Sequence, residues 1–186
     1  MQLAFVAYAG DCRLYGEVEL DLDRLSDLLS VGDDYALENV VLESLADGHR
    51  VALPELAIGC HDLCAVEALG SRGDPRRRIR TRLHRMQLRV GPYLVAGFLH
   101  TMPGADPLTA FVRRGPFVAL TEATLAYSLA GEPQLHDAAV ILVNHELVEW
   151  IRPVADEGRA FPNVPVKQSP GTRDLTWEIY TDSISC

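Results

Sequence analysis

Residues 25–32, Leu-Ser-Asp-Leu-Leu-Ser-Val-Gly, are matched in order and character by residues 108–115, Leu-Thr-Ala-Phe-Val-Arg-Arg-Gly, 83 positions further along the chain. The same spacing holds without a gap through four more pairs, which are Ala36/Ala119, Leu37/Leu120, Leu42/Leu125 and Gly48/Gly131. Self-similarity at a fixed spacing is typical of a duplicated structural unit. The sequence is therefore predicted to contain two related units.

The match extends outward on both sides with small changes in spacing. Upstream, Gly16 and Gly97 correspond at a spacing of 81, and we expect the turn at residues 103–104 to absorb the difference. Downstream, His61 and His145 correspond at a spacing of 84, which suggests that this histidine has a structural role in both units.

Each unit has the same expected order of a strand through a glycine, a short amphipathic helix, a strand, a glycine turn and a further strand. The expected strands are 13–20, 36–45 and 56–66, then 93–101, 117–129 and 139–151; the expected helices are 24–29 and 107–112. Asp23 and Asp106 are suited to cap the two helices, and Pro107 suits a first helical turn. Runs such as residues 140–143 are rich in β-branched side chains, which favour strands.

This pattern predicts a mainly β fold (β-rich α+β) with two small barrel-like units in tandem, or with two halves that interlock into one larger barrel. The expected boundaries are 1–72 for the first unit, 73–90 for an Arg-rich connecting strand, 91–152 for the second unit and 153–186 for a Pro-rich extension.

The first unit has Gly16 in its first strand, Asp34, the run 39–43 (Asn-Val-Val-Leu-Glu) and the run 58–60 (Ile-Gly-Cys), and residues 93–151 repeat the pattern more weakly. In these residues and their order, the first unit resembles the Sm-like small β-barrels. The resemblance implies a small barrel. Where the family has the Arg-Gly pair of its RNA pocket, this chain has Gly59-Cys60 and Val143-Asn144. Residues 24–37 also resemble a segment of uncharacterised bacterial proteins, which implies no activity.

Composition limits the classes of protein to which the chain can belong. Its 186 residues are 48% hydrophobic with a net charge of −9, which favours a soluble domain with a sizeable core. Apolar stretches such as residues 3–9 are too short to span a membrane, and no secretory signal is recognised. We therefore expect a cytoplasmic protein with reduced cysteines and no membrane partner.

Charge is unevenly distributed along the sequence. Residues 1–72 carry −10, whereas residues 73–90 carry +6 through seven arginines. Alternation predicts a strand with one cationic face, and a change of phase after His84 predicts a β-bulge. The candidate anion-binding residues are Arg76, Arg78, Arg80, Arg82 and Arg85. They could be neutralised by the acidic first unit, bind nucleic acid or a nucleotide, or bind an acidic protein; the acidic total disfavours nucleic acid.

The Pro-rich extension contains one strand-like stretch at residues 175–180. Its alternating apolar residues Leu175, Trp177 and Ile179 are candidate partner-binding residues. The stretch could complete the protein's own sheet or add to the sheet edge of a partner.

Evidence for chemistry in the sequence is weak. Cys60, His61 and Cys64 could form part of a zinc site only if the chain turned there, because cysteines four apart in a strand lie about 13 Å from each other. Groups that could catalyse hydrolysis are His100 with Thr101 and Asp106, and the carboxylates Glu146 and Glu149. The sequence contains no phosphate loop, dinucleotide fingerprint or His-Glu-x-x-His motif, so no cofactor and no metal are predicted.

The favoured prediction is therefore a non-catalytic adaptor or an assembly or regulatory subunit that acts through contacts with a protein partner or with itself. Binding of nucleic acid or nucleotides through the arginines is the first alternative. A metal-dependent or hydrolytic enzyme is the second.

Overall fold

The computed structural model describes residues 2–19, 25–31, 34–69 and 80–154, and this part of the chain is mainly β, as predicted. The strands are β1 (Gln2–Ala9), β2 (Cys12–Glu19), β3 (Asp34–Ser44), β4 (Arg50–Gly59), β5 (Leu63–Glu67), β6 (Arg82–Val90), β7 (Tyr93–Thr101), β8 (Phe117–Leu129), β9 (Glu132–Asn144) and β10 (Val148–Pro153). The helices are α1 (Leu25–Val31) and α2 (Pro107–Val112). Short 3-10 turns, η1 (Cys60–Asp62) and η3 (His145–Leu147), precede β5 and β10.

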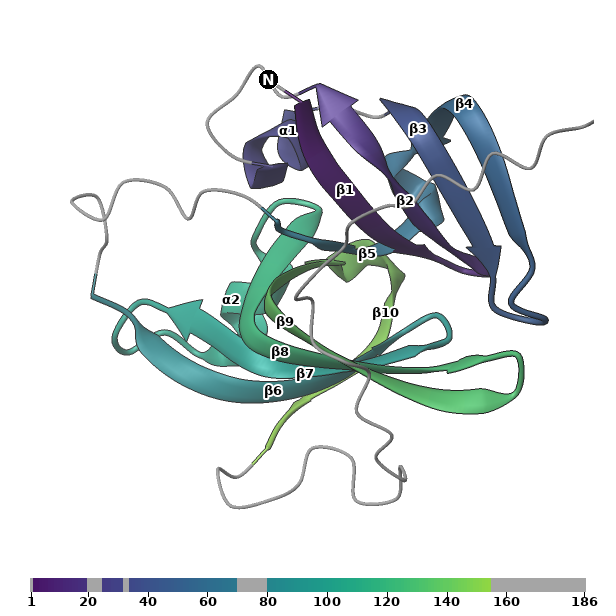
Figure 1. Ribbon diagram of the computed structural model, residues 1–186. Coiled ribbons are helices and arrows are strands. Elements are labelled where there is room, and N and C mark those ends of the chain that lie inside the picture. The colour runs from purple at the N-terminus through teal and green to yellow at the C-terminus, as the bar shows by residue number, and fades with distance from the viewer. Residues whose placement is uncertain (1, 20–24, 32–33, 70–79, 155–186) are drawn as a thin grey trace, which may run out of the picture.

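All of these strands belong to one antiparallel sheet with the order β10-β6-β7-β8-β9-β5-β1-β2-β3-β4 (Figure 1). The first strand group, β1–β5, is arranged as β5-β1-β2-β3-β4, and the second strand group, β6–β10, as β10-β6-β7-β8-β9. The pairing of β5 with β9 joins the two groups. Because β10 and β4 lie at opposite ends, the sheet is not closed, and the prediction of barrel-like units is not confirmed at that level of detail.

A bulge bends the third strand of each group. Asn39 in β3 and Glu122 in β8 lie 83 residues apart, and both have a positive φ, 52° and 48°. The register of each strand shifts by one residue against the preceding strand, between Tyr15 and Glu17 of β2 and between Ala96 and Phe98 of β7, so β3 and β8 each have one extra residue there. The bulge moves the buried positions by one residue, so both ends of each bent strand face the same core.

Glycine is needed where the second strand of each group crosses this bulge. A Cβ added to Gly97 of β7 would lie 3.1 Å from the Thr121 carbonyl oxygen, and one added to Gly16 of β2 would lie 3.2 Å from the Glu38 carbonyl oxygen. The close approach of backbone to backbone explains why the sequence keeps a glycine at both places.

The left-handed backbone at Glu122 leads to a first prediction. A left-handed conformation costs a non-glycine residue about 1–2 kcal/mol, whereas glycine pays about 0.5–1 kcal/mol in chain entropy. We expect E122G to raise the free energy of unfolding by about 0.5 kcal/mol, measured by urea denaturation. The matched control is S128G, at an exposed position of the same strand. This substitution should lower the free energy of unfolding. Equal destabilisation by both variants would contradict the prediction.

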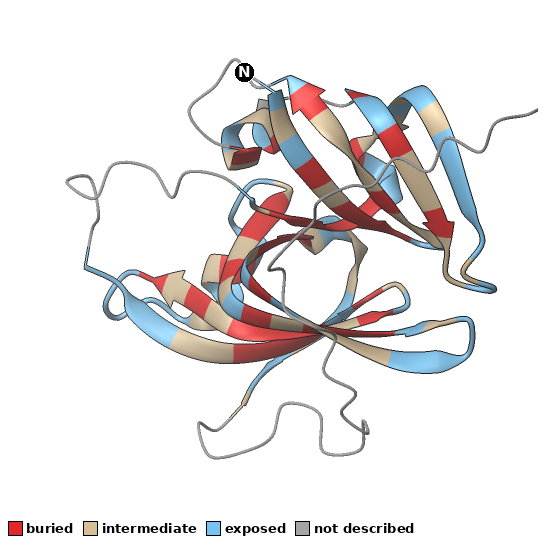
Figure 2. Cartoon of the chain, viewed as in Figure 1, coloured by how far each residue is buried: buried red, intermediate tan, exposed pale blue. Residues whose placement is uncertain are grey.

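Two hydrophobic cores lie on either side of the joint between the groups. The first core contains Phe5, Leu37 and Leu63, and the second contains Leu88, Leu120 and Ile141. Strands β1, β5 and β9 supply side chains to both cores, and every residue of β5 is buried (Figure 2).

Local signals predicted the second helix correctly. Helix α2 spans the expected residues; the Asp106 carboxylate accepts a hydrogen bond of 2.7 Å from the Thr109 N–H, and Pro107 lies in the first turn. The helix expected at 24–29 is found as α1, while Asp23 lies outside the described residues.

The last strand expected in each unit is wrong in its extent. The range 56–66 is divided by η1 and the range 139–151 by η3, so each becomes two strands. Because η1 begins at Cys60 and η3 at His145, the two histidines that the sequence aligned occupy different places. The His61 side chain is exposed, whereas His145 is half-buried and its Nδ1 lies 3.0 Å from the Pro116 carbonyl oxygen.

The Arg-rich strand also differs from its prediction. Residues 73–79 of the expected connecting strand lie outside the described residues, and the rest forms β6, which lies in the second strand group between β10 and β7. It pairs with β7 in continuous register from Arg82 to Val90, so the bulge expected after His84 is wrong. Regular alternation is maintained because Leu83 is exposed and His84 is turned inward.

Candidate functional site

The joint between the two strand groups is a short antiparallel pairing. Ala65, Val66 and Glu67 of β5 lie opposite Val143, Leu142 and Ile141 of β9, and the Ala68 N–H donates a hydrogen bond of 3.1 Å to the Val140 carbonyl oxygen. Beyond the backbone, Glu67 Oε2 lies 2.8 Å from His136 Nε2 across the same two strands. Apolar burial and a polar pair therefore both hold the groups together.

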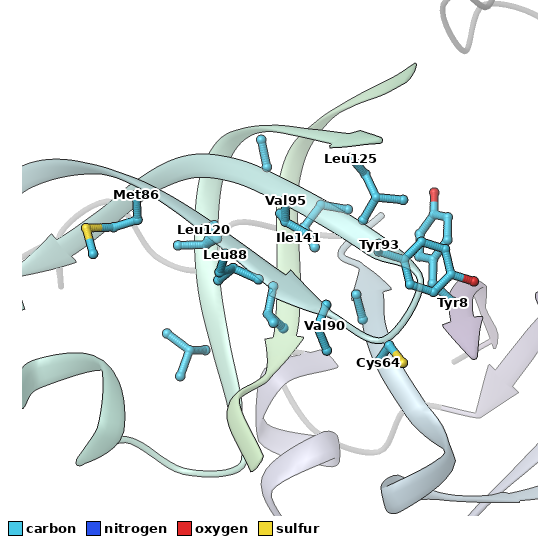
Figure 3. Close-up of a cluster of buried hydrophobic side chains, with 14 of the residues drawn as sticks. Tyr8, Cys64, Met86, Leu88, Val90, Tyr93, Val95, Leu120, Leu125 and Ile141 are labelled. Atoms are coloured by element: carbon cyan, nitrogen blue, oxygen red, sulfur yellow. The ribbon is translucent and has the colours of Figure 1, made fainter. Parts of the chain in front are cut away.

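Three tyrosines fill the second core beside the joint. The Tyr8 ring of β1 meets the Tyr93 ring at 5.5 Å edge to face (Figure 3). The Tyr127 ring lies 5.8 Å from that of Tyr93. The Tyr93 hydroxyl donates to the carbonyl oxygens of Ala9 and Cys12, at 2.7 and 3.2 Å. Burial raises the pKa of Tyr8 and Tyr93 far above that of free tyrosine, so both are neutral. The Tyr93 hydroxyl ties the second group to the first.

A buried carboxylate adds an ionic link at the same joint. Glu43 of β3 is 2% exposed and accepts hydrogen bonds from Arg13 Nε and Arg50 Nε, both at 2.9 Å. Arg13 also donates to the Tyr127 hydroxyl of β8. Burial alone would raise the pKa of Glu43, but the hydrogen bonds from the two arginines outweigh it and lower that pKa. Glu43 is therefore a permanently charged anchor near neutral pH.

A hollow of about 460 Å³ opens on the first strand group beside β4. We call it the β4 hollow; its lining residues are Ala9, Gly10, Asp11, Cys12, Leu14, Leu42, Leu56, Ile58 and Asp62. Its wall is mainly apolar, with the two aspartates as its acidic groups. Burial, with a smaller effect of Asp11, raises the pKa of the Cys12 thiol to about 11, so the thiol is protonated at neutral pH and poorly nucleophilic. The hollow is suited to receive an apolar group rather than to perform chemistry.

The two end strands of the sheet are further candidate binding surfaces. Strand β4 pairs only with β3, and β10 pairs only with β6, among the strands that the structure describes. Large apolar side chains lie exposed on both, Val51 on β4 (42%) and Trp150 on β10 (39%). The Arg152 guanidinium lies 5.7 Å from the Trp150 ring centre, and Arg89 Nε lies 3.4 Å from Glu149 Oε2, so the aromatic group is surrounded by charges.

The predicted anion-binding arginines are only partly placed by the structure. Arg76 and Arg78 lie outside the described residues, as do the tail residues Leu175, Trp177 and Ile179. Arg80 and Arg82 are exposed, whereas Arg85 is half-buried and interacts with another group of the protein. Strand β6 lies between β10 and β7 in the sheet. It therefore does not pair with any described strand of the acidic first strand group.

The residues considered for catalysis do not form a reactive arrangement. Nδ1 and Nε2 of His100 lie 3.0 and 2.8 Å from the hydroxyls of Thr81 and Thr121, while Asp106 caps α2. Glu149 pairs with Arg89, and Glu146 lies 3.7 Å from the exposed His61.

The two cysteines considered for zinc face different cores. Cys60 packs in the first core and Cys64 in the second, because η1 turns the chain between them. The described part of the chain contains no group of three or more His, Cys, Asp or Glu side chains that could hold a metal ion.

Comparison of the chain with protein-family models, with curated proteins and with solved structures gives no match. The resemblance to Sm-like barrels therefore stays a prediction. Within the described ranges, no helix has the length and apolar character needed to cross a membrane.

Sequence reasoning missed the β4 hollow, the joint and the open edges. One signal was present: Trp150 is a large aromatic residue in the polar context Glu149-Trp150-Ile151-Arg152. An aromatic residue on a strand that also carries charges on both sides is typical of a contact surface.

Proposed function

We propose that this chain is a non-catalytic adaptor or assembly subunit that binds other proteins through the open edges of its sheet. One observation carries the proposal: β9, the fourth strand of the second group, pairs with β5, the fifth strand of the first group. The corresponding strands β4 and β10 have no such neighbour among the strands that the structure describes. Edge strands present unpaired N–H and C=O groups, which can pair with another chain.

We further propose that the two strand groups are related barrel-like units. The shared strand order, the matching bulges at Asn39 and Glu122, the glycines at 16 and 97 and the 3-10 turn before each fifth strand support this proposal. If the units are related, the pairing of β5 with β9 indicates which contact the end strands can make, because β10 corresponds to β5 and β4 corresponds to β9.

A binding role without catalysis is supported by what the reactive side chains do. Within the described residues, His100, Asp106 and Glu149 all make structural contacts, and the Cys12 thiol has a raised pKa. Binding of nucleic acid through Arg76, Arg78, Arg80, Arg82 and Arg85 stays a prediction.

Photo-cross-linking in cells that express the chain tests the proposed function. A photoreactive amino acid is placed at Val51 on β4 or at Trp150 on β10, with exposed Arg113 and Ser128 as control positions away from both edges. We expect protein adducts at the two edge positions and much weaker labelling at the controls. Equal labelling at all four positions, or none at the edges, would remove the proposal.

A further inference from the structure

The β4 hollow is the uncovered counterpart of a surface that is fully buried elsewhere in the same chain. Counting from the shared 3-10 turns, Leu56 and Ile58 of β4 correspond to Ile141 and Val143 of β9, 85 residues later. Ile141 and Val143 are 0% exposed, whereas Leu56 and Ile58 are only half-buried and line the hollow. Ile141 and Val143 are buried because the first strand group supplies Tyr8, Cys64 and Ala65, which pack in the second core.

The second group has a strand that could cover the hollow in the same way. Val148 and Ile151 of β10 correspond to Leu63 and Val66 of β5, and each pair packs against the core of its own group. The outward position matched to Ala65 holds Trp150. Ala65 is fully buried at the joint, while Trp150 is exposed on the open edge.

We propose that the partner of these edges is a second copy of this chain, an inference that rests on the proposed function. Strand β10 of one copy pairs antiparallel with β4 of the next in the register of the β5–β9 joint, with Trp150 opposite Ile58 and Ile151 opposite Ala57. The Trp150 ring then enters the β4 hollow, whose apolar wall and volume suit a large aromatic side chain.

Charge complementarity favours this occupant over an unrelated strand. The hollow carries Asp11 and Asp62 and belongs to a segment with a net charge of −10. Trp150 is accompanied by Arg152 and, on the neighbouring strand, by Arg89 of the segment with a net charge of +6; Arg89 pairs with Glu149, so the two arginines exceed this carboxylate by one charge. Within one chain these surfaces lie at opposite ends of the sheet, so they can meet edge to edge only between copies.

The contact is head to tail, because it joins two different surfaces. Repetition of such a contact gives a ring if the rotation closes and a filament if it does not. The contact is also short: Pro153 corresponds to Ala68, whose N–H bonds to Val140 at the internal joint, and proline has no N–H to offer.

Sedimentation velocity with two edge variants tests this inference on the purified full-length chain. We expect the wild type to self-associate at concentrations up to about 0.1 mM, and W150A to weaken the association at least about 30-fold. A57E, which places a charge on the exposed outer face of β4, should also give monomers. S128E is the control and should associate as the wild type does. Circular dichroism checks that all variants are folded.

Mixing the two edge variants gives the sharpest result. W150A keeps an intact β4 hollow and A57E keeps an intact β10, so an equimolar mixture should form 1:1 dimers that neither forms alone. In a W177F background Trp150 is the sole tryptophan, and its emission should shift to the blue on association. A mixture that stays monomeric, or a W150A variant that associates like the wild type, would overturn the inference.

The two proposals can fail separately. A wild-type chain that stays monomeric, while photo-cross-links from Val51 lead to a different protein, overturns the second-copy inference and leaves the proposed function standing. The absence of both association and edge adducts removes both.

Discussion

Replacing Tyr93 with alanine is expected to lower the free energy of unfolding by about 3–5 kcal/mol. The ring is fully buried in the second core, where it contacts Tyr8 and Tyr127, and its hydroxyl bonds to two carbonyl oxygens of the first strand group. The variant loses the buried surface and leaves a cavity. Because whole domains are stable by only about 5–15 kcal/mol, much of the total would be lost.

Urea denaturation followed by circular dichroism measures the effect, and Y93F is the matched control. Phenylalanine keeps the ring and removes only the hydroxyl, so it should cost about 1–2 kcal/mol for the carbonyl oxygens left with one donor fewer. A single unfolding transition is expected for the wild type, because the Tyr93 side chain packs in the second core and bonds to the first strand group. If Y93A costs no more than Y93F, the packing argument is wrong.

Replacing Glu43 with alanine is expected to cost about 3–5 kcal/mol, as is typical when one partner of a buried ion pair is removed. The carboxylate is almost fully buried, and Arg13 is also largely covered, so the variant leaves a buried cation without its counter-charge. Arg50 bonds to the same carboxylate but its side chain is 67% exposed, and R50A should therefore cost less than about 1 kcal/mol. A similar cost for E43A and R50A would contradict this assignment.

The same carboxylate predicts a pH dependence. Its pKa is lowered in the folded protein, so its contribution to stability is complete above the ordinary glutamate value of 4.5 and is lost as the pH falls through the lowered folded value. Urea midpoints measured across this acidic range should fall more steeply for the wild type than for E43Q, which has no carboxyl group to titrate. Parallel curves would exclude Glu43 as a source of acid sensitivity.

Local patterns were sufficient to predict the elements that depend on neighbouring residues. Helix α2 follows from Asp106 and Pro107 at its start, and β7 and β8 match their expected bounds because their apolar residues recur at the spacing of a strand. The ungapped spacing of 83 residues also implies that Asn39 corresponds to Glu122, but only the backbone shows that both have a positive φ.

Features that depend on distant contacts could not be predicted in this way. The division of 56–66 by η1 is stabilised by Cys60 in one core and Cys64 in the other, and the cores are defined only once the sheet has formed. Arg13 and Glu43 are 30 residues apart, and the link from Arg13 to Tyr127 spans 114. The phase change after His84 was misread because Leu83 was expected to be buried, whereas it is exposed at the start of β6.

Completion of the first core by residues from β8 and β9 has a consequence during protein synthesis. Phe117 and Leu142 pack against side chains of β1 and β5, yet Leu142 is made 75 residues after Glu67. At the usual elongation rate of about 5–20 residues per second, the nascent N-terminal half waits roughly 4–15 s on the ribosome with apolar surface uncovered. Chaperone engagement should therefore be strongest on ribosome-bound chains arrested before residue 117 and should fall once Leu142 has left the exit tunnel.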